Sequence, residues 1–233
     1  MSTLIVRQLG FREYEDTAAA MRAFTDARDA GSADEIWLLE HPPVFTLGRA
    51  ATLTHVLDPG DIPVVRSERG GQVTYHGPGQ LVAYVLIDLQ RRNLGIKRLV
   101  QVLEDTLIEL LSGYAIAGAR RPGAPGVYVD GKKIAALGLR VRRGCSYHGI
   151  SLNVAMDLEP FRRINPCGYP GLEVTQLAEL ADIDRQTLTA VGGSFARILA
   201  RRIGYNDVQL DTPSAPSPGL KARASNLAQG IAS

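Results

Sequence analysis

The sequence predicts an α+β fold in which helices pack against a mixed β-sheet. Short β-rich apolar runs are interspersed with longer segments whose apolar residues recur at helical spacing. A tight hairpin signal occurs together with longer crossover segments, and this combination favours a mixed sheet. With 233 residues and 45% hydrophobic content, the chain can bury one sizeable core. We therefore expect a single domain over residues 1–211 and a loosely ordered Pro/Ser/Ala-rich tail over residues 212–233.

The first part of the chain predicts one helix followed by short strands. Residues 13–30 combine apolar and charged residues at helical spacing, which predicts an amphipathic helix. Residues 35–40 form an apolar run bounded by charges, which predicts a strand that ends at His41-Pro42-Pro43. Residues 44–47 and 64–65 predict two further strands, separated by an irregular span.

The remaining elements follow from stronger patterns. Residues 81–87 are β-rich and apolar on both faces, so they predict the central strand of the sheet. Residues 97–111 predict a helix that stops at Gly113. Asp130-Gly131 lies between apolar runs and predicts a β-hairpin over residues 127–136. A strand over residues 146–154 and a helix over residues 185–203 complete the prediction.

Charge and composition exclude several classes of protein. The formal net charge is only +2, which argues against a dedicated nucleic-acid binder. The N-terminal residues lack the pattern of a secretory signal, and no stretch approaches the ~20 apolar residues that span a membrane. Two cysteines without an export signal are expected to be reduced. We therefore expect a cytoplasmic protein without a nucleic-acid or membrane partner.

Cys167 is the most informative single residue. It lies in the segment Asn165-Pro166-Cys167-Gly168, where proline and glycine predict a sharply turned loop. A thiol on such a loop can approach a substrate from an open side, so Cys167 is a candidate nucleophile. The alternative is a small buried hydrophobe with no chemical role. A nucleophilic thiol also needs a neighbouring Lys or His that favours the thiolate.

Three further segments carry candidate partners. Arg69 to Gln80 is rich in glycine and lets backbone approach a ligand, with Arg69 and His76 as polar groups; an ordinary connection is the alternative. Lys132 and Lys133 should point to opposite faces of the hairpin, one solvated and one inward, and alternation alone does not say which. His148 is a weaker candidate, because a lone histidine is more often structural.

Taken in order, these segments resemble a known family. The markers are His41-Pro42-Pro43-Val44-Phe45-Thr46-Leu47-Gly48-Arg49, Arg69-Gly70-Gly71 with His76-Gly77-Pro78-Gly79-Gln80-Leu81, Gly131-Lys132-Lys133-Ile134-Ala135-Ala136-Leu137-Gly138, His148-Gly149 with Asn153, and Asn165-Pro166-Cys167-Gly168. Their order and spacing resemble the octanoyltransferases of lipoate biosynthesis.

The resemblance implies a fold, an activity and partners. The fold would be similar to the catalytic domains of biotin and lipoate protein ligases. The activity would be transfer of an octanoyl (or lipoyl) group from acyl carrier protein to a specific lysine of lipoyl domains. Those domains belong to the E2 subunits of 2-oxoacid dehydrogenases and to the glycine cleavage H protein. No metal or cofactor is implied, and by family analogy we expect a monomer.

The resemblance also assigns roles to residues. It implies that Cys167 carries the acyl thioester and that Lys133 favours the thiolate and can act as a base. Neutral Lys133, His76 or His148 could take the proton of the acceptor amine. The implied substrate contacts come from three segments: Arg69, Gly70, Gly71, Gln72, Val73, Thr74, Tyr75, His76, Ala136, Leu137, Gly138, Gly149, Ile150 and Ser151.

Three other kinds of function remain open at the level of sequence. An ATP-dependent lipoate- or biotin-type ligase would share the Arg-Gly-Gly and His pattern but needs no nucleophilic cysteine. A non-catalytic module that binds lipoyl domains or acyl carriers would retain the groove without the chemistry. A thioesterase would release free octanoate if water reached the acyl-enzyme.

Overall fold

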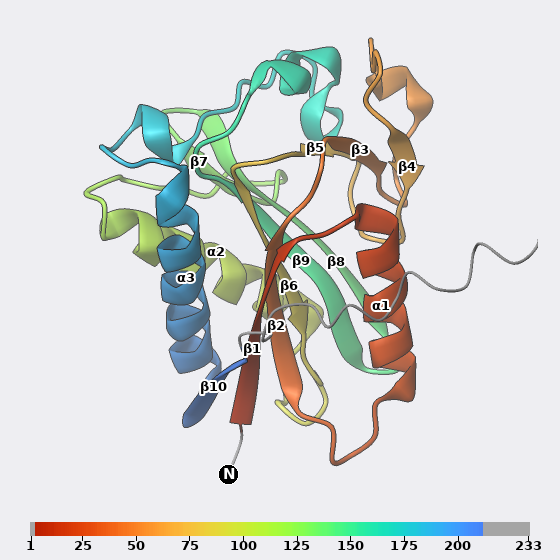
Figure 1. The fold of residues 1–233 in the computed structure, drawn as a ribbon, viewed down its shortest axis with the longest axis vertical. Helices are drawn as coiled ribbons and strands as arrows, with labels where there is room; N and C mark the ends of the chain where they lie inside the picture. Colours follow the sequence, from red (N-terminus) through yellow and green to blue (C-terminus); the bar gives the residue numbers. More distant parts are fainter. Residues whose placement is uncertain (1–2, 212–233) are drawn as a thin grey trace, which may run out of the picture.

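The structure is a computed structural model that describes residues 3–211 (Figure 1). Its helices are α1 (Tyr14–Ala27), α2 (Ile96–Ser112) and α3 (Leu188–Ile203). Its strands are β1 (Thr3–Phe11), β2 (Asp34–Glu40), β3 (Val44–Leu47), β4 (Val64–Arg66), β5 (Val73–His76), β6 (Gln80–Leu86), β7 (Val127–Val129), β8 (Lys132–Arg142), β9 (Cys145–Asn153) and β10 (Asp207–Asp211). The predicted loosely ordered tail lies outside the described residues.

A seven-stranded mixed sheet forms the centre of the fold. Its order is β10-β1-β2-β6-β9-β8-β7, and β1 pairs in parallel with both β10 and β2. The other pairings in this sheet are antiparallel. Helices α2 and α3 cover one face, α1 covers the other, and a small sheet of order β4-β3-β5 lies at one end (Figure 1). The predicted α+β class with a mixed sheet is confirmed.

The strand β6 shows why this architecture follows from the sequence. All its side chains are buried, as the apolar run predicts for a central strand. Because side chains alternate, Leu81, Ala83 and Val85 belong to the core beneath α2 and α3. The intervening Val82, Tyr84 and Leu86 belong to a smaller core beneath α1. Burial on both faces fixes the register of the strand.

Most predicted elements are present, with shifted ends. The predicted hairpin is there, with positive φ at Asp130 and Gly131, but its second strand continues to Arg142. That strand pairs with β9 over its whole second half, and a further turn at Arg143 and Gly144 joins the two. Polar residues such as Arg140 hid this continuation, because both sides of the strand are only partly buried there.

Three strands were not predicted. β1 lies within the sheet between β10 and β2, although it was considered only as a possible signal segment. β5 lies within the glycine-rich span Arg69–Gln80, for which no strand was predicted, and it pairs antiparallel with β3. β10 has an exposed pattern and pairs only with β1 among the described strands. Pairing partners distant in sequence, which local pattern does not show, stabilise these short strands.

Candidate active site

Cys167 lies on a tight turn, as the sequence predicted. The turn is a single 3-10 turn, Pro166–Gly168, and φ is +57° at Cys167 and +79° at Gly168. A positive φ at a residue other than glycine is unfavourable, so the surrounding contacts must hold it. Asn165 does so from one side, because its N–H donates to the His55 carbonyl at 2.8 Å and its carbonyl accepts from the Gly168 N–H at 2.9 Å. The thiol is left half-buried.

Lys133 is the inward member of the lysine pair. Its side chain is buried with 4% exposure, whereas the Lys132 side chain is 47% exposed and lies 3.9 Å from Glu173. Both backbone groups of Lys133 are held by one neighbouring segment, since its N–H donates to the Glu173 carbonyl and its carbonyl accepts from the Thr175 N–H. The register of β8 therefore resolves the choice that alternation left open.

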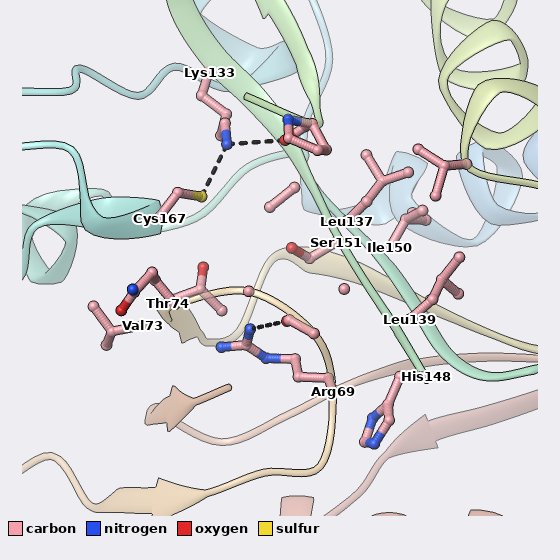
Figure 2. A pocket seen from close by; sticks show the side chains of 18 of the residues that line it. Arg69, Val73, Thr74, Lys133, Leu137, Leu139, His148, Ile150, Ser151 and Cys167 are labelled. Atoms are coloured by element: carbon pink, nitrogen blue, oxygen red, sulfur yellow. Dashed lines mark hydrogen bonds between the residues drawn. The ribbon is translucent and has the colours of Figure 1, made fainter. Parts of the chain in front are cut away.

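The two candidate residues are in direct contact. Lys133 Nζ donates to Cys167 Sγ at 2.9 Å and to the Pro125 carbonyl at 3.2 Å (Figure 2). It also lies 5.2 Å from the centre of the Tyr128 ring. Burial lowers the pKa of Lys133, but the charge of the Cys167 thiolate and its hydrogen bond outweigh burial, so the pKa is raised above its ordinary value. The Lys133 ammonium is thus held against the Cys167 sulfur.

A cavity of about 280 Å³ opens beside this pair. Leu137, Leu139 and Ile150 supply aliphatic surface on the side away from Cys167 (Figure 2). Ala136 and Gly138 line the cavity on the β8 side, where their small size leaves space for a ligand. The volume is at the small end of the range for ligand pockets, and the mostly apolar wall suits an alkyl chain.

Nearly all predicted contact residues line this cavity. The segments that converge on it are residues 69–76, 136–138 and 149–151, together with Lys133 and Cys167. Tyr75 is the exception. Because side chains alternate along β5, the Tyr75 side chain points to the other face and packs against Phe45 and Phe161. It contributes to the core beneath the small sheet.

Arg69 holds the glycine-rich segment in place. Its guanidinium is buried and donates to the Thr46 carbonyl, the Thr46 hydroxyl and the Gly70 carbonyl. The segment is also pinned to β8, since the Gly70 N–H donates to the Leu139 carbonyl at 3.0 Å. A side chain at Gly48 would collide with this arrangement, because its Cβ would lie 2.3 Å from the Gly71 carbonyl oxygen.

The two candidate histidines differ from Lys133 in environment. Burial, with the neighbouring charges of His41 and Arg69, lowers the pKa of His76 to about 3. Burial also lowers the pKa of His148 to about 3. His76 Nδ1 donates to Gln80 Oε1 at 2.7 Å. His148 lies across the cavity from the Cys167–Lys133 pair (Figure 2). Both rings are neutral at pH 7 and are weak proton acceptors.

Sequence reasoning missed part of the cavity wall. The missed residues are Tyr14, Val82, Tyr84, Val100, Gly123, Ala124, Pro125, Leu139 and Tyr169. Pro122-Gly123-Ala124-Pro125-Gly126 carried a usable signal, because it is as rich in glycine and proline as the segment around Gly70. The others come from α1, α2, the strands β6 and β8 and, for Tyr169, the turn that follows Cys167, and they reach the cavity only through the tertiary fold.

Two further features concern residues 3–211, the part of the chain that the structure describes. No group of three or more His, Cys, Asp or Glu side chains in this part could hold a metal ion. No helix in it is long and apolar enough to cross a membrane.

Comparison with known proteins decides the family. The model of the lipoyl protein ligase A/B catalytic domain matches residues 13–193. The octanoyltransferase of Alkalilimnicola ehrlichii is 60% identical over 180 residues, which cover 77% of this chain and 84% of that protein. The octanoyltransferase of Pseudomonas putida is 62% identical over 175 residues, which cover 75% and 81%. The chain belongs to the octanoyltransferase family. As a member, it is an acyltransferase of octanoyl or lipoyl groups.

Solved structures confirm the fold that the resemblance implied. The bi-partite lipoate protein ligase of Thermoplasma acidophilum, described with its E2 lipoyl domain, has a TM-score of 0.73 at 16% identity and covers 92% of this chain and 89% of that one. A lipoate-protein ligase A bound with ATP has a TM-score of 0.71 at 14% identity, covering 92% and 90%. The biotin protein ligase of Aquifex aeolicus has a TM-score of 0.50 at 12% identity, covering 87% and 69%.

Proposed function

We propose that this octanoyltransferase moves an octanoyl group from acyl carrier protein to a specific lysine of a lipoyl domain, through a thioester on Cys167. The observation that carries the proposal is the 2.9 Å hydrogen bond from Lys133 Nζ to Cys167 Sγ beside an apolar cavity. An ordinary cysteine is mostly protonated at neutral pH, and a neighbouring ammonium favours the reactive thiolate.

The first half-reaction loads the enzyme. The Cys167 thiolate attacks the thioester carbon of octanoyl-acyl carrier protein, forming a tetrahedral oxyanion. The carbon–sulfur bond to the phosphopantetheine arm then breaks. The departing thiolate takes a proton from the Lys133 ammonium, leaving a neutral amine beside the new thioester. The alkyl chain lies along Leu137 and Ile150, which line the cavity.

The developing oxyanion needs hydrogen-bond donors. Backbone N–H groups near Ala136–Gly138 and at Gly70 or Gly71 are the nearest candidates among the cavity residues. The Gly70 N–H already donates to the Leu139 carbonyl. Gly71 is therefore the better candidate of that pair, and its positive φ of 88° fits a turned backbone that can present the N–H.

The second half-reaction delivers the acyl group. The ε-amine of the acceptor lysine attacks the Cys167 thioester, and the amide that forms is more stable than the thioester. Neutral Lys133 takes the proton that the attacking nitrogen loses, and the ammonium–thiolate pair is restored. Lys133 is better placed for this than His76 or His148, whose low pKa makes them weak bases. The lipoyl-domain acceptor is proposed from the family and from the E2 lipoyl domain described with the archaeal neighbour.

An intact-mass experiment tests the proposal. The purified protein is mixed with octanoyl-acyl carrier protein without ATP. The expected product is a hydroxylamine-labile octanoyl adduct on Cys167 that disappears when an apo lipoyl domain is added and reappears as an amide on that domain. A Cys167→Ser variant should form no such adduct. If no adduct forms, and the domain is modified only when ATP and free octanoate are supplied, the chain acts as a ligase instead.

A further inference from the structure

The peptide group that joins Pro125 to Gly126 lies between two charged side chains. Its carbonyl oxygen accepts a hydrogen bond from Lys133 Nζ at 3.2 Å, and its N–H donates to Glu104 Oε1 at 3.0 Å. The carbonyl and N–H of a trans peptide point in opposite directions. The ammonium and the carboxylate therefore act on the two ends of one peptide dipole. Each charge polarises the peptide in the sense that strengthens the other hydrogen bond.

Glu104 is an unusual residue for its position. It lies in the middle of α2 and is only 6% exposed, on the side of the helix that packs toward the sheet. A buried carboxylate is costly unless it is paired and hydrogen-bonded. Here Oε2 accepts from Arg120 Nε at 2.9 Å, which leaves Oε1 for the Gly126 N–H. Glu104 does not line the cavity.

The loop segment Ala124–Gly126, which lies between the Glu104 and Lys133 side chains, packs closely against the lysine. Gly126 has φ of +138°, and a Cβ there would lie 2.6 Å from the Ala135 carbonyl oxygen and 3.3 Å from Lys133 Nζ. The loop backbone is thus in contact with the lysine side chain. The Tyr128 hydroxyl fixes the Ala124 carbonyl at 3.0 Å, one peptide further back. The orientation of the Pro125–Gly126 peptide itself is set by Glu104 on one side and Lys133 on the other.

We propose that Glu104 is a positioning residue that acts on Lys133 through the Pro125–Gly126 peptide. The carboxylate holds the N–H, the peptide plane directs the Pro125 carbonyl at Nζ, and the carbonyl keeps the lysine pointed at Cys167. The proposal rests on the proposed function, because it gives Lys133 its catalytic task. It adds a residue of α2, outside the cavity, to the parts that set the reactivity of Cys167.

The variant Glu104→Gln tests this at nearly constant side-chain size. The amide oxygen can still accept from Gly126, but the charge that polarises the peptide is gone. The matched control is Asp105→Asn, because Asp105 is the next residue on α2 and also bonds Arg120, whereas the hydrogen bonds of the Pro125–Gly126 peptide go to Glu104 and Lys133. Alkylation of Cys167 by iodoacetamide, mapped by mass spectrometry from pH 6 to 10, reports the reactivity of the thiol. Single-turnover acylation by octanoyl-acyl carrier protein and thermal unfolding are measured in parallel.

In Glu104→Gln we expect alkylation and acylation at pH 7 to be about three- to tenfold slower, with the pH profile of alkylation moved to higher pH. Asp105→Asn should keep the wild-type profile. A Glu104→Gln profile equal to that of wild type, in a folded protein, overturns the proposal even if stability falls, because a merely structural role changes stability alone. If Glu104→Gln does not fold, Glu104→Asp decides by the same comparison, since it keeps the charge but withdraws it from Gly126. If the wild-type protein forms no octanoyl adduct on Cys167 with octanoyl-acyl carrier protein, the proposed function is refuted instead.

Discussion

Replacement of Lys133 by methionine is the sharpest test of the proposed chemistry. Methionine keeps the unbranched apolar stem in its buried site and removes the ammonium that lies 2.9 Å from Cys167 Sγ. At that separation, two unit charges attract by about 6 kcal/mol for an effective dielectric constant of 20. Burial of both groups offsets several kcal/mol of this attraction. A hydrogen bond to a charged group typically contributes a net of about 1.5–3 kcal/mol.

This net free energy sets the expected change in the acylation rate. If loss of the ammonium raises the free energy of the thiolate by about 1.5–3 kcal/mol, less thiolate is present at pH 7. Acylation in Lys133→Met should then be roughly ten- to a hundredfold slower. The assay is single-turnover transfer from octanoyl-acyl carrier protein to Cys167, followed by rapid quench and intact mass. Part of the deficit should be recovered near pH 9, because an unassisted cysteine ionises near pH 8.5.

Lys132→Met is the matched control for this experiment. It removes the same kind of charge from the adjacent residue, but its side chain faces solvent and lies 3.9 Å from Glu173. Its acylation rate should stay within about twofold of wild type, since exposed ion pairs contribute little. Two results would refute the reasoning: wild-type acylation at pH 7 in Lys133→Met, or an equal loss in both variants.

Three other predictions concern the walls of the site. Because the pKa of His76 and of His148 is lowered to about 3 from an unfolded value near 6.5, the stability they contribute is present above pH 6.5 and is lost as pH falls. Between pH 7 and pH 5, each of these two histidines should lower the free energy of unfolding in urea by about 2 kcal/mol, and an unchanged value would contradict this. Gly149→Ala would place a Cβ 2.0 Å from the Ala83 carbonyl oxygen, so the free energy of unfolding should fall by about 2–4 kcal/mol in the same assay, and a loss under 1 kcal/mol would argue against that contact. Leu137→Trp should fill the cavity and lower kcat/KM for octanoyl relative to butanoyl donors by up to about two-hundredfold, at about 0.8 kcal/mol for each of four methylenes. An unchanged ratio would mean that the alkyl chain lies elsewhere.

Local pattern was sufficient for the long and strongly biased elements. The strand β6 was predicted because its residues are apolar on both faces, and burial of both faces is what the structure shows. The helix α2 was predicted within one residue at each end, since Gly113 stops it. β5 was missed because its four residues lie between glycine-rich turns, and only its pairing with β3 makes it a strand.

The candidate site shows the same division between local and tertiary information. The turn at Cys167 could be predicted from Pro166 and Gly168, because both restrict the local backbone. Alternation predicted that one lysine faces inward, but only the resemblance to a family pointed to Lys133 before the fold was available. Glu104 could not be found in this way, since a glutamate in an amphipathic helix looks like an ordinary surface residue until Arg120 and Gly126 are placed around it.

The burial of Lys133 has opposite consequences in the two proposed half-reactions. Before acylation, the thiolate is close enough to outweigh burial, and the pKa of Lys133 is raised. Once Cys167 carries a neutral thioester that anion is gone, and desolvation, which lowers the pKa of a buried amine, acts with less opposition. The same side chain then changes from a stabilising cation to a proton acceptor at the step where the acceptor amine must lose a proton. An arginine could supply the cation but not the acceptor, because its guanidinium stays protonated in proteins. The proposed two-step transfer therefore requires a lysine, buried and in direct contact with the cysteine.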